Sequence, residues 1–433
     1  MYKRQVLGRA GAWCGQNKYL SAIKNAFQNF MPLTIAGAIG VLWCNVLVND
    51  QTGLGLFFKP IMALDFLNPA FQAVNFCTIS CITVGITLGI AQEIGVWNMG
   101  AEKAGYIPGL VGLAAWLSVT NTSHMVEGAK EAFTGIAGNE LGATGLFTGM
   151  IIGVLSVELF CFFEKQDALK IKMPEQVPPG VARAFEVLVP ATITLIITAC
   201  IGSACYNLTG LYLNDVIKNG IQGPLGAVGA TIPGVMIIYL VIMLFWLVGI
   251  HGNNMLSAVK EALFTPLALE NVEKFNKGEK PTNIINMYAL QMWGEFGGSG
   301  VTIGLVIAIM IFGKREDNKA IASLSLVPGL FNINETVTFG VPMVLNPILG
   351  IPFVVAPLIT IIIGYVLTVI GFCPVACLTV PWTTPPIVFG FLATGANVMG
   401  AVTQAILIVV STVIYVPFLI AYEKYQNKQA AEA

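Results

Sequence analysis

Two asparagines and one glutamate stand within four residues in the segment GLFNINETVTFG. They are Asn332, Asn334 and Glu335, and residues 336–421 that follow contain no Asp, Glu, Lys or Arg. A carboxylate beside such an apolar stretch is costly unless it has a partner or a function. Paired amides and a carboxylate can form bidentate, charge-assisted hydrogen bonds with neighbouring hydroxyl groups. A solvated loop end is the simpler interpretation, but the Pro and Gly residues around the segment favour a ligand-binding role.

A second polar cluster follows an apolar run in the segment WLVGIHGNNML. His251 ends the run, and Gly252, Asn253 and Asn254 come directly after it. An imidazole can donate or accept hydrogen bonds and titrates near neutral pH. A lone histidine at a helix end is usually an ordinary polar residue, but a histidine that begins such a cluster indicates a binding site.

The segment MWGEFGGSG adds a second ionisable group to an apolar region, because Glu295 precedes three closely spaced glycines that permit an unwound backbone. Tryptophans lie close to these irregular segments, and an indole face packs well on the apolar face of a sugar ring. Trp246 and Trp382 are therefore candidate ligand contacts, although tryptophan is also common at membrane interfaces.

The sequence contains no motif for nucleotide hydrolysis and no cluster typical of metal binding. The phosphate-binding pattern GxxxxGK[ST] does not occur, so the sequence predicts no ATPase activity. The nine cysteines lie mostly in apolar segments without accompanying His or acidic clusters, and buried small hydrophobic residues explain them better than a metal site. We expect no metal and no cofactor.

The composition indicates a membrane protein that crosses the bilayer several times. Hydrophobic residues make up 56% of the 433 residues and charged residues only 10%, whereas a soluble domain is about 25% charged. The net charge of −1 excludes a basic nucleic-acid-binding surface.

The first half contains five apolar windows of membrane-spanning length. They cover residues 27–48, 66–92, 104–119, 141–163 and 187–206. Short amphipathic stretches between them, at 56–66 and 128–138, are expected to lie as helices along the membrane interface. Basic residues concentrate in the amino-terminal arm, in the loop at 164–186 and in the tail, so we expect all three, and thus both termini, in the cytoplasm.

The second half has less regular hydropathy. The uncharged run 336–421 is long enough for about four passages, but prolines interrupt it twice, and WGEFGGSG interrupts residues 284–312. Broken helices are tolerated in a membrane where they are buried in protein or line a cavity. We therefore predict an all-α polytopic membrane protein with about ten transmembrane helices: a five-span domain at 1–206, an amphipathic connector at 207–229, and a substrate-binding domain at 230–433 with re-entrant hairpins.

Four segments together resemble a known family. PGLFNINETVTFGVPMVLNP, GIHG, GGSG and the amino-terminal YLSAIKNAFQNFMPLTIAG are similar to the membrane component (EIIC) of the sugar phosphotransferase system. The similarity covers nearly the whole chain and is closest to the lactose, cellobiose and N,N′-diacetylchitobiose branch. One departure is Thr336, because Pro usually follows the Glu in the family.

The resemblance implies a phosphorylation-coupled transporter of a β-linked disaccharide in the bacterial plasma membrane. It implies a homodimer formed through the amino-terminal domain, and a separate cytosolic EIIB protein whose phosphocysteine phosphorylates the sugar 6-hydroxyl. Glu335 and His251 would act at that hydroxyl, with help from Asn332 and Asn334. The chain itself would be the permease subunit of the phosphotransferase complex.

Two other functions remain open from the sequence. A secondary sugar transporter driven by protons or sodium could use Glu295, Glu335 and His251 as a proton relay. A sugar receptor without transport would normally carry a soluble output domain, and no charged segment of this chain is long enough for one.

Overall fold

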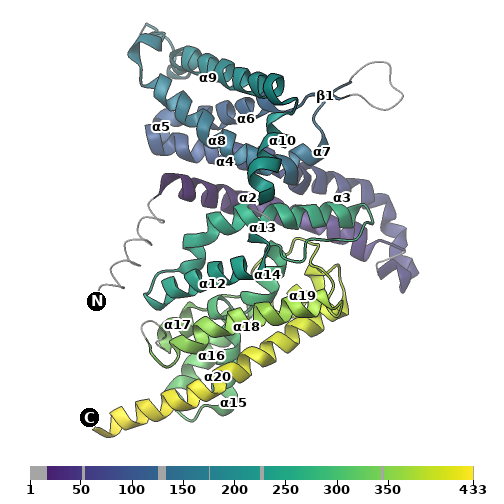
Figure 1. Cartoon of the computed structure of the whole chain (residues 1–433), viewed down its shortest axis with the longest axis vertical. Helices are drawn as coiled ribbons and strands as arrows, with labels where there is room; N and C mark the ends of the chain where they lie inside the picture. Colours follow the sequence, from purple (N-terminus) through teal and green to yellow (C-terminus); the bar gives the residue numbers. More distant parts are fainter. Residues whose placement is uncertain are drawn as a thin grey trace. The chain divides into compact units, whose positions relative to one another are not determined.

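The structure, a computed structural model, describes residues 17–50, 54–124, 133–174, 176–224, 229–341, 343 and 346–432. Most of these residues are helical, as Figure 1 shows. The strands among the described residues form one two-stranded antiparallel sheet of β1 (Ser123–His124) and β2 (Phe133–Thr134), in which Ser123 pairs with Thr134. The all-α fold class predicted from the sequence is confirmed.

The chain forms two compact units. In its described residues the amino-terminal unit comprises 17–37, 73–124, 133–174 and 176–224, and the carboxy-terminal unit comprises 38–50, 54–72, 229–341, 343 and 346–432. Residues 38–72 thus pack with the second half of the chain, and the long helix α2 (Lys18–Leu42) continues from one unit into the other.

In the amino-terminal unit, four helices carry most of the packing: α4 lies against α6 and α8, and α9 packs on α6 and α8. Buried large side chains such as Trp116 and Phe160 fill the space between them. Small residues allow close approach, because Gly112 of α6 lies directly on Ala91 of α4. The helices from residue 68 onward are α3 (Asn68–Asn75), α4 (Ile82–Met99), α5 (Ala101–Ala104), α6 (Ile107–Val119), α7 (Gly138–Leu141), α8 (Ala143–Glu164), α9 (Pro179–Thr209) and α10 (Leu213–Ile217).

The carboxy-terminal unit is built around the helices α15, α18 and α20. α15 and α18 both pack on α20, while α12 and α14 pack on α18. Its helices are α12 (Ile232–Leu247), α13 (Gly252–Asn276), α14 (Met287–Gly294), α15 (Ile303–Phe312), α16 (Glu316–Leu330), α17 (Glu335–Gly340), α18 (Gly350–Val369), α19 (Val388–Ala393) and α20 (Val398–Glu432). The 3-10 and π-helical segments of the two units are η1 (Trp43–Leu47), η2 (Leu54–Leu56), η3 (Lys59–Leu67), η4 (Phe76–Ser80), η5 (Asp167–Leu169), η6 (Lys218–Gln222) and η7 (Ser299–Val301).

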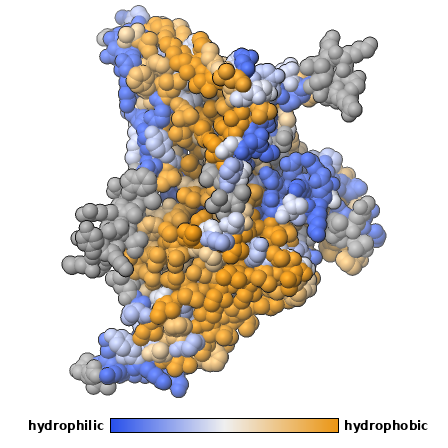
Figure 2. All heavy atoms as spheres, in the orientation of Figure 1, coloured by the Kyte–Doolittle hydropathy of each residue, from blue (hydrophilic) through white to orange (hydrophobic). Residues whose placement is uncertain are grey.

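Five helices among the described residues are long and apolar enough to cross a membrane: Lys18–Leu47, Ala143–Glu164, Pro179–Thr209, Gly350–Val369 and Val398–Gln429. Two bent pairs raise the number to seven, namely Lys59–Ser80 with Ile82–Met99 and Met287–Val301 with Ile303–Phe312. Apolar side chains cover much of the surface seen in Figure 2. Each of the five windows predicted in the first half lies on one of these helices, on a bent pair, or on the shorter α6.

The described part of the uncharged run 336–421 holds two helices of spanning length, and residues 374–387 between α18 and α20 are irregular, as the prolines there predicted. One sequence expectation, the second interfacial helix, needs correction. In the stretch 128–138, residues 128–132 lie outside the described part, and Phe133–Thr134 form a strand instead of a helix, as suits an aromatic followed by a β-branched residue.

Candidate functional site

His251 and Glu335 face each other across a short gap in the carboxy-terminal unit. His251 lies just before α13, and Glu335 is the first residue of the short helix α17. The Nε2 of His251 and the Oε1 of Glu335 are 3.8 Å apart, and the side chains are 36% and 48% exposed. This separation is too long for a direct hydrogen bond. Both groups are therefore open to a ligand.

The backbone fixes which imidazole nitrogen carries the proton. The N–H of Asn254 donates to the Nδ1 of His251 at 3.3 Å and so caps the start of α13. A nitrogen that accepts a hydrogen bond carries no proton, so in the neutral ring the proton lies on Nε2. The gap to Glu335 thus has a hydrogen-bond donor on one side and a carboxylate acceptor on the other.

The charge state of His251 follows from its surroundings. Partial burial lowers the pKa of this imidazole, and this effect outweighs the carboxylate of Glu335, which acts in the opposite direction. His251 is accordingly neutral at pH 7. A neutral ring can donate from Nε2 without forming a full salt bridge with Glu335.

Trp246 packs against the imidazole ring of His251. Its ring centroid lies 4.4 Å from that of His251, and Phe353 of α18 packs edge-on against the indole at 6.3 Å. Trp246 is only 2% exposed. The structure therefore places Trp246 as a support for His251, and not on a surface that a ligand can reach.

Asn332 ties three irregular segments together with one side chain. Its Oδ1 accepts from the backbone N–H of Gly297 (2.6 Å), and its Nδ2 donates to the carbonyl oxygens of Trp382 and Thr384. The backbone of Asn332 has φ of 62°, in the left-handed region that asparagine tolerates better than most residues. The break between α16 and α17 depends on these two properties of Asn332.

Asn334 and Asn253 meet at Ser299. The Nδ2 of Asn334 donates to the carbonyl oxygen of Ser299 (2.7 Å), and the Nδ2 of Asn253 donates to the Ser299 hydroxyl (2.8 Å). Asn334 is 4% exposed. These amides hold the segments that carry Glu335 and His251 against the glycine-rich turn between α14 and α15.

Glu295 is engaged in an internal ion pair. Its Oε1 is bonded to the Nζ of Lys260 and accepts from the hydroxyl of Tyr239 at 2.7 Å. Lys260 also donates to the Oδ1 of Asn253 at 3.4 Å, which joins the ion pair to the chain that ends at Ser299. The Lys260 and Glu295 side chains are 7% and 17% exposed. Glu295 thus contributes charge balance and support, whereas Glu335 stays accessible.

The remaining predicted site residues lie around this network. The side chain of Asn254 is exposed, and Trp382 is 44% exposed directly beside Asn332, where its indole is available to a ligand. Gly252 is buried, and a Cβ there would overlap the carbonyl oxygen of Ile242. Only a glycine allows α13 to begin this close to α12.

Sequence reasoning missed Lys260, Tyr239 and Ser299. Lys260 lies seven residues after Asn253 and therefore on the same face of α13. Lys260 and Glu295 are opposite charges in an apolar protein, and this combination in the sequence could have predicted an ion pair between them. Tyr239 in an apolar span carried no such signal.

Comparisons with known proteins agree on one family. A family model described as "Phosphotransferase system, EIIC" matches residues 24–357. The oligo-beta-mannoside-specific EIIC component of Bacillus subtilis is 33% identical over 94% of this chain and 90% of its own length. The cellobiose-specific EIIC component of Lactococcus lactis is 30% identical over 99% of this chain and 98% of its own.

A solved structure has the same fold along the whole chain. The crystal structure of ChbC, the IIC component from the N,N′-diacetylchitobiose-specific phosphotransferase system, superposes with a TM-score of 0.90 and 28% sequence identity. It covers 100% of this chain, and this chain covers 99% of it. The chain belongs to the EIIC family, the integral membrane components through which the phosphotransferase system transports sugars.

Proposed function

We propose that this EIIC protein transports a β-linked disaccharide and presents its 6-hydroxyl, in the gap between His251 and Glu335, to a phosphocysteine on a cytosolic EIIB protein. The observation that carries the proposal is the 3.8 Å separation between Nε2 and Oε1. A hydroxyl oxygen beside this pair, off the line that joins the two atoms, can accept from Nε2–H and donate its own proton to the carboxylate.

The chemistry of transfer suits this arrangement. The sugar hydroxyl attacks phosphorus as the bond from phosphorus to the cysteine sulfur breaks, and its proton passes to Glu335. A carboxylate oriented on the attacking hydroxyl contributes general-base assistance, and Nε2–H fixes the lone pair that attacks. The internal pairing of Glu295 with Lys260 leaves Glu335 as the accessible carboxylate of this network.

The substrate class follows from the relatives. The proteins similar to this chain are named for oligo-beta-mannosides, cellobiose and N,N′-diacetylchitobiose. These sugars share β-linkages, and the exposed indole of Trp382 offers a flat apolar face for one of their rings. We assign Asn332, Asn334 and Asn253 to positioning the site, because their side chains are bonded within the protein.

The same proposal covers assembly and orientation. The five-span domain at 1–206 forms the contact of a homodimer, 207–229 connects it, and 230–433 binds the sugar. Both termini lie in the cytoplasm, where EIIB docks. The pairing of Glu295 also argues against the ion-driven alternative, because it removes one carboxylate from the proton relay that such a transporter would use.

The test is phosphoryl transfer in membranes that contain matched amounts of protein. Phosphorylated EIIB and cellobiose, N,N′-diacetylchitobiose, lactose or a β-mannobiose are supplied, and sugar phosphate is measured. Glu335→Gln keeps the size but accepts no proton, so the rate with the preferred sugar should fall about 10²–10⁴-fold. Glu273→Gln, which removes an exposed carboxylate elsewhere in the unit, serves as the control. A wild-type rate in Glu335→Gln, or ion-driven accumulation of free sugar by the protein alone, would refute the proposal.

A further inference from the structure

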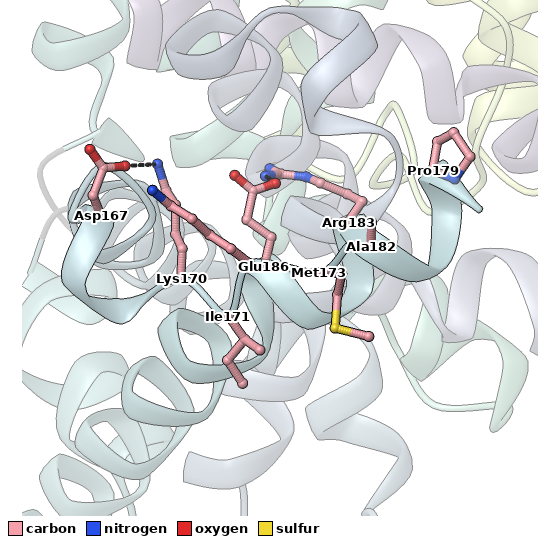
Figure 3. Close-up of a pocket in the computed structure, with 9 residues that line it drawn as sticks. Asp167, Lys170, Ile171, Met173, Pro179, Ala182, Arg183 and Glu186 are labelled. Carbon is pink, nitrogen blue, oxygen red and sulfur yellow. Dashed lines mark hydrogen bonds and ion pairs between the residues drawn. The ribbon is translucent and has the colours of Figure 1, made fainter. Parts of the chain in front are cut away.

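A basic pocket lies in the amino-terminal unit, apart from the sugar site. It has a volume of about 580 Å³ and is formed by the loop after α8 and the first turns of α9. Figure 3 shows Lys170 turned toward Asp167, and the head groups of Arg183 and Glu186 next to each other. Ile171 and Met173 supply an apolar part of the lining.

The position of the pocket sets its depth in the bilayer. α8 ends at Glu164 and α9 begins at Pro179, and both helices are of spanning length. The segment between two such ends lies at the level of the lipid headgroups. Only 22% of the apolar window of α9 is buried, and Val181, Phe185 and Leu188 near its start are exposed. A lipid chain can therefore run along α9 directly from the pocket.

The charges of the pocket leave room for one anion. Its lining contains three cations, Lys170, Lys172 and Arg183, and two carboxylates, Asp167 and Glu186. Arg183 also binds Glu164, but that carboxylate is balanced by Lys103 at 2.8 Å. One positive charge remains, and the single negative charge of a phosphodiester would neutralise it.

Two donors remain available for that anion. Lys172 is exposed and forms no ion pair with another described residue. The Nε of Arg183 is buried and has no hydrogen-bond partner in the described part of the chain. A guanidinium and an ammonium beside apolar side chains suit a phosphate that is attached to a hydrocarbon chain.

We infer that this pocket binds the phosphodiester headgroup of an anionic phospholipid, with Lys172 and Arg183 as donors to the phosphate and with the acyl chains along α9. The lipid would fix the loop between α8 and α9 at the membrane surface. This inference does not depend on the proposed sugar site, since all of its residues lie in the other unit.

The experiment is lipid titration of the purified full-length protein in detergent, followed by native mass spectrometry. Dioleoylphosphatidylglycerol is compared with zwitterionic dioleoylphosphatidylcholine, and inorganic phosphate and glycerophosphoglycerol are added as soluble competitors. Lys172→Gln breaks no ion pair and should weaken phosphatidylglycerol binding about fivefold, and Lys170→Gln/Lys172→Gln should weaken it about thirtyfold, at roughly 1 kcal/mol per basic residue. Lys277→Gln/Lys280→Gln, with the same change in net charge in the other unit, should bind phosphatidylglycerol as the wild type does.

The outcomes separate the possible ligands. Preference for phosphatidylglycerol that is lost in the Lys170/Lys172 variants and unaffected by millimolar soluble phosphate supports a lipid site. Equal binding of both lipids, equal losses in the control variant, or full displacement by inorganic phosphate would overturn it. So would unchanged lipid binding combined with weaker EIIB binding in Lys170→Gln/Lys172→Gln, because the surface would then be a protein contact.

Discussion

Glu295 and Glu335 are two carboxylates in one unit with opposite surroundings. Glu295 is bonded to Lys260 and Tyr239 and is largely buried, whereas Glu335 is half exposed and faces a neutral imidazole. Environment divides the roles of paired carboxylates in this way when one must act on a ligand and the other must support the structure. From residue types alone both were candidates for sugar binding, and only the position of Lys260 separates them.

The protonation of His251 gives a test at this scale. Burial lowers the pKa of His251 from its ordinary value of 6.5, and Lys260 lowers it further. Glu335 and Glu295 raise this pKa, but by less. The imidazole of His251 is therefore protonated at lower pH than an ordinary histidine. The imidazolium would form a salt bridge with Glu335 and close the gap, so we expect the rate of sugar phosphorylation to fall as the pH falls through the lowered pKa.

The measurement is single-turnover transfer from EIIB that has been phosphorylated beforehand, between pH 4.5 and 8. His251→Gln should be slower throughout, because the amide holds the hydroxyl less well, and should lose the acid-side decrease that belongs to the imidazole. An acid limb of the same shape in wild type and His251→Gln would assign the titration to another group and contradict the role given to His251.

At the scale of elements, a chain of polar contacts holds the breaks in the helices. It runs from Glu295 through Lys260 and Asn253 to Ser299 and then to Asn334. Tyr415 of α20 adds a hydrogen bond to the carbonyl oxygen of Gly300, at 2.8 Å. Unwound backbone at membrane depth has free N–H and C=O groups, and side chains from neighbouring helices supply their partners.

Removal of one member of the buried ion pair should be more harmful than removal of both. Lys260→Met leaves the Glu295 charge buried without its partner, which typically costs about 3–5 kcal/mol of folding free energy, while a neutral pair is much better tolerated. We expect a lower thermal midpoint and weaker sugar binding in Lys260→Met, and recovery of much of both in Lys260→Met/Glu295→Gln. If the losses of thermal midpoint and sugar affinity in the double variant equal the sum of those in the two single variants, the ion pair does not stabilise the site.

Gly252→Ala tests the contact between α12 and α13. The new Cβ would overlap the carbonyl oxygen of Ile242 and push the start of α13, with His251, away from Glu335. Overpacking of this kind costs about 1–3 kcal/mol, and sugar affinity should fall with it. Gly180→Ala is the matched control, since nothing lies near its Cβ position. Titration calorimetry with the preferred disaccharide measures the affinity of each variant. Equal affinities of Gly252→Ala and Gly180→Ala would show that the position of His251 does not depend on this contact.

Periodicity and hydropathy predicted elements better than they predicted contacts. The windows at 141–163 and 187–206 match α8 and α9 closely, because the absence of charge over a spanning length is a strong local signal. The glycines of GGSG correctly predicted the break between α14 and α15, which are bent by 59°. The partners of Asn332 could not be predicted, because Gly297 and Trp382 reach it through tertiary packing and leave no trace in the local sequence.

In the whole molecule, the long uncharged run contains both spanning helices and irregular segments that are packed inside the protein. In the described part of 336–421, α18 packs on α20, and the irregular segment between them holds buried residues such as Ala376 and Leu378. The polar groups of the site enter from α13, from the α14–α15 turn and from the α16–α17 break. Hydropathy alone does not distinguish a spanning helix from apolar loops that are packed inside the protein, and the prolines supply that distinction here.

The distribution of basic residues predicts how the chain is oriented in the membrane. Lys165, Lys170, Lys172 and Arg183 lie in the connection between α8 and α9, and positive loops stay in the cytoplasm. In cysteine-free protein, single cysteines at Lys172 and Lys424 should resist a membrane-impermeant maleimide in intact cells and react after permeabilisation. Thr134→Cys is the matched control, because it is exposed and α8 separates it from Lys172, so it should react from outside. Labelling of Lys172→Cys in intact cells at the rate of Thr134→Cys would reverse this topology, and with it the side from which EIIB reaches the sugar.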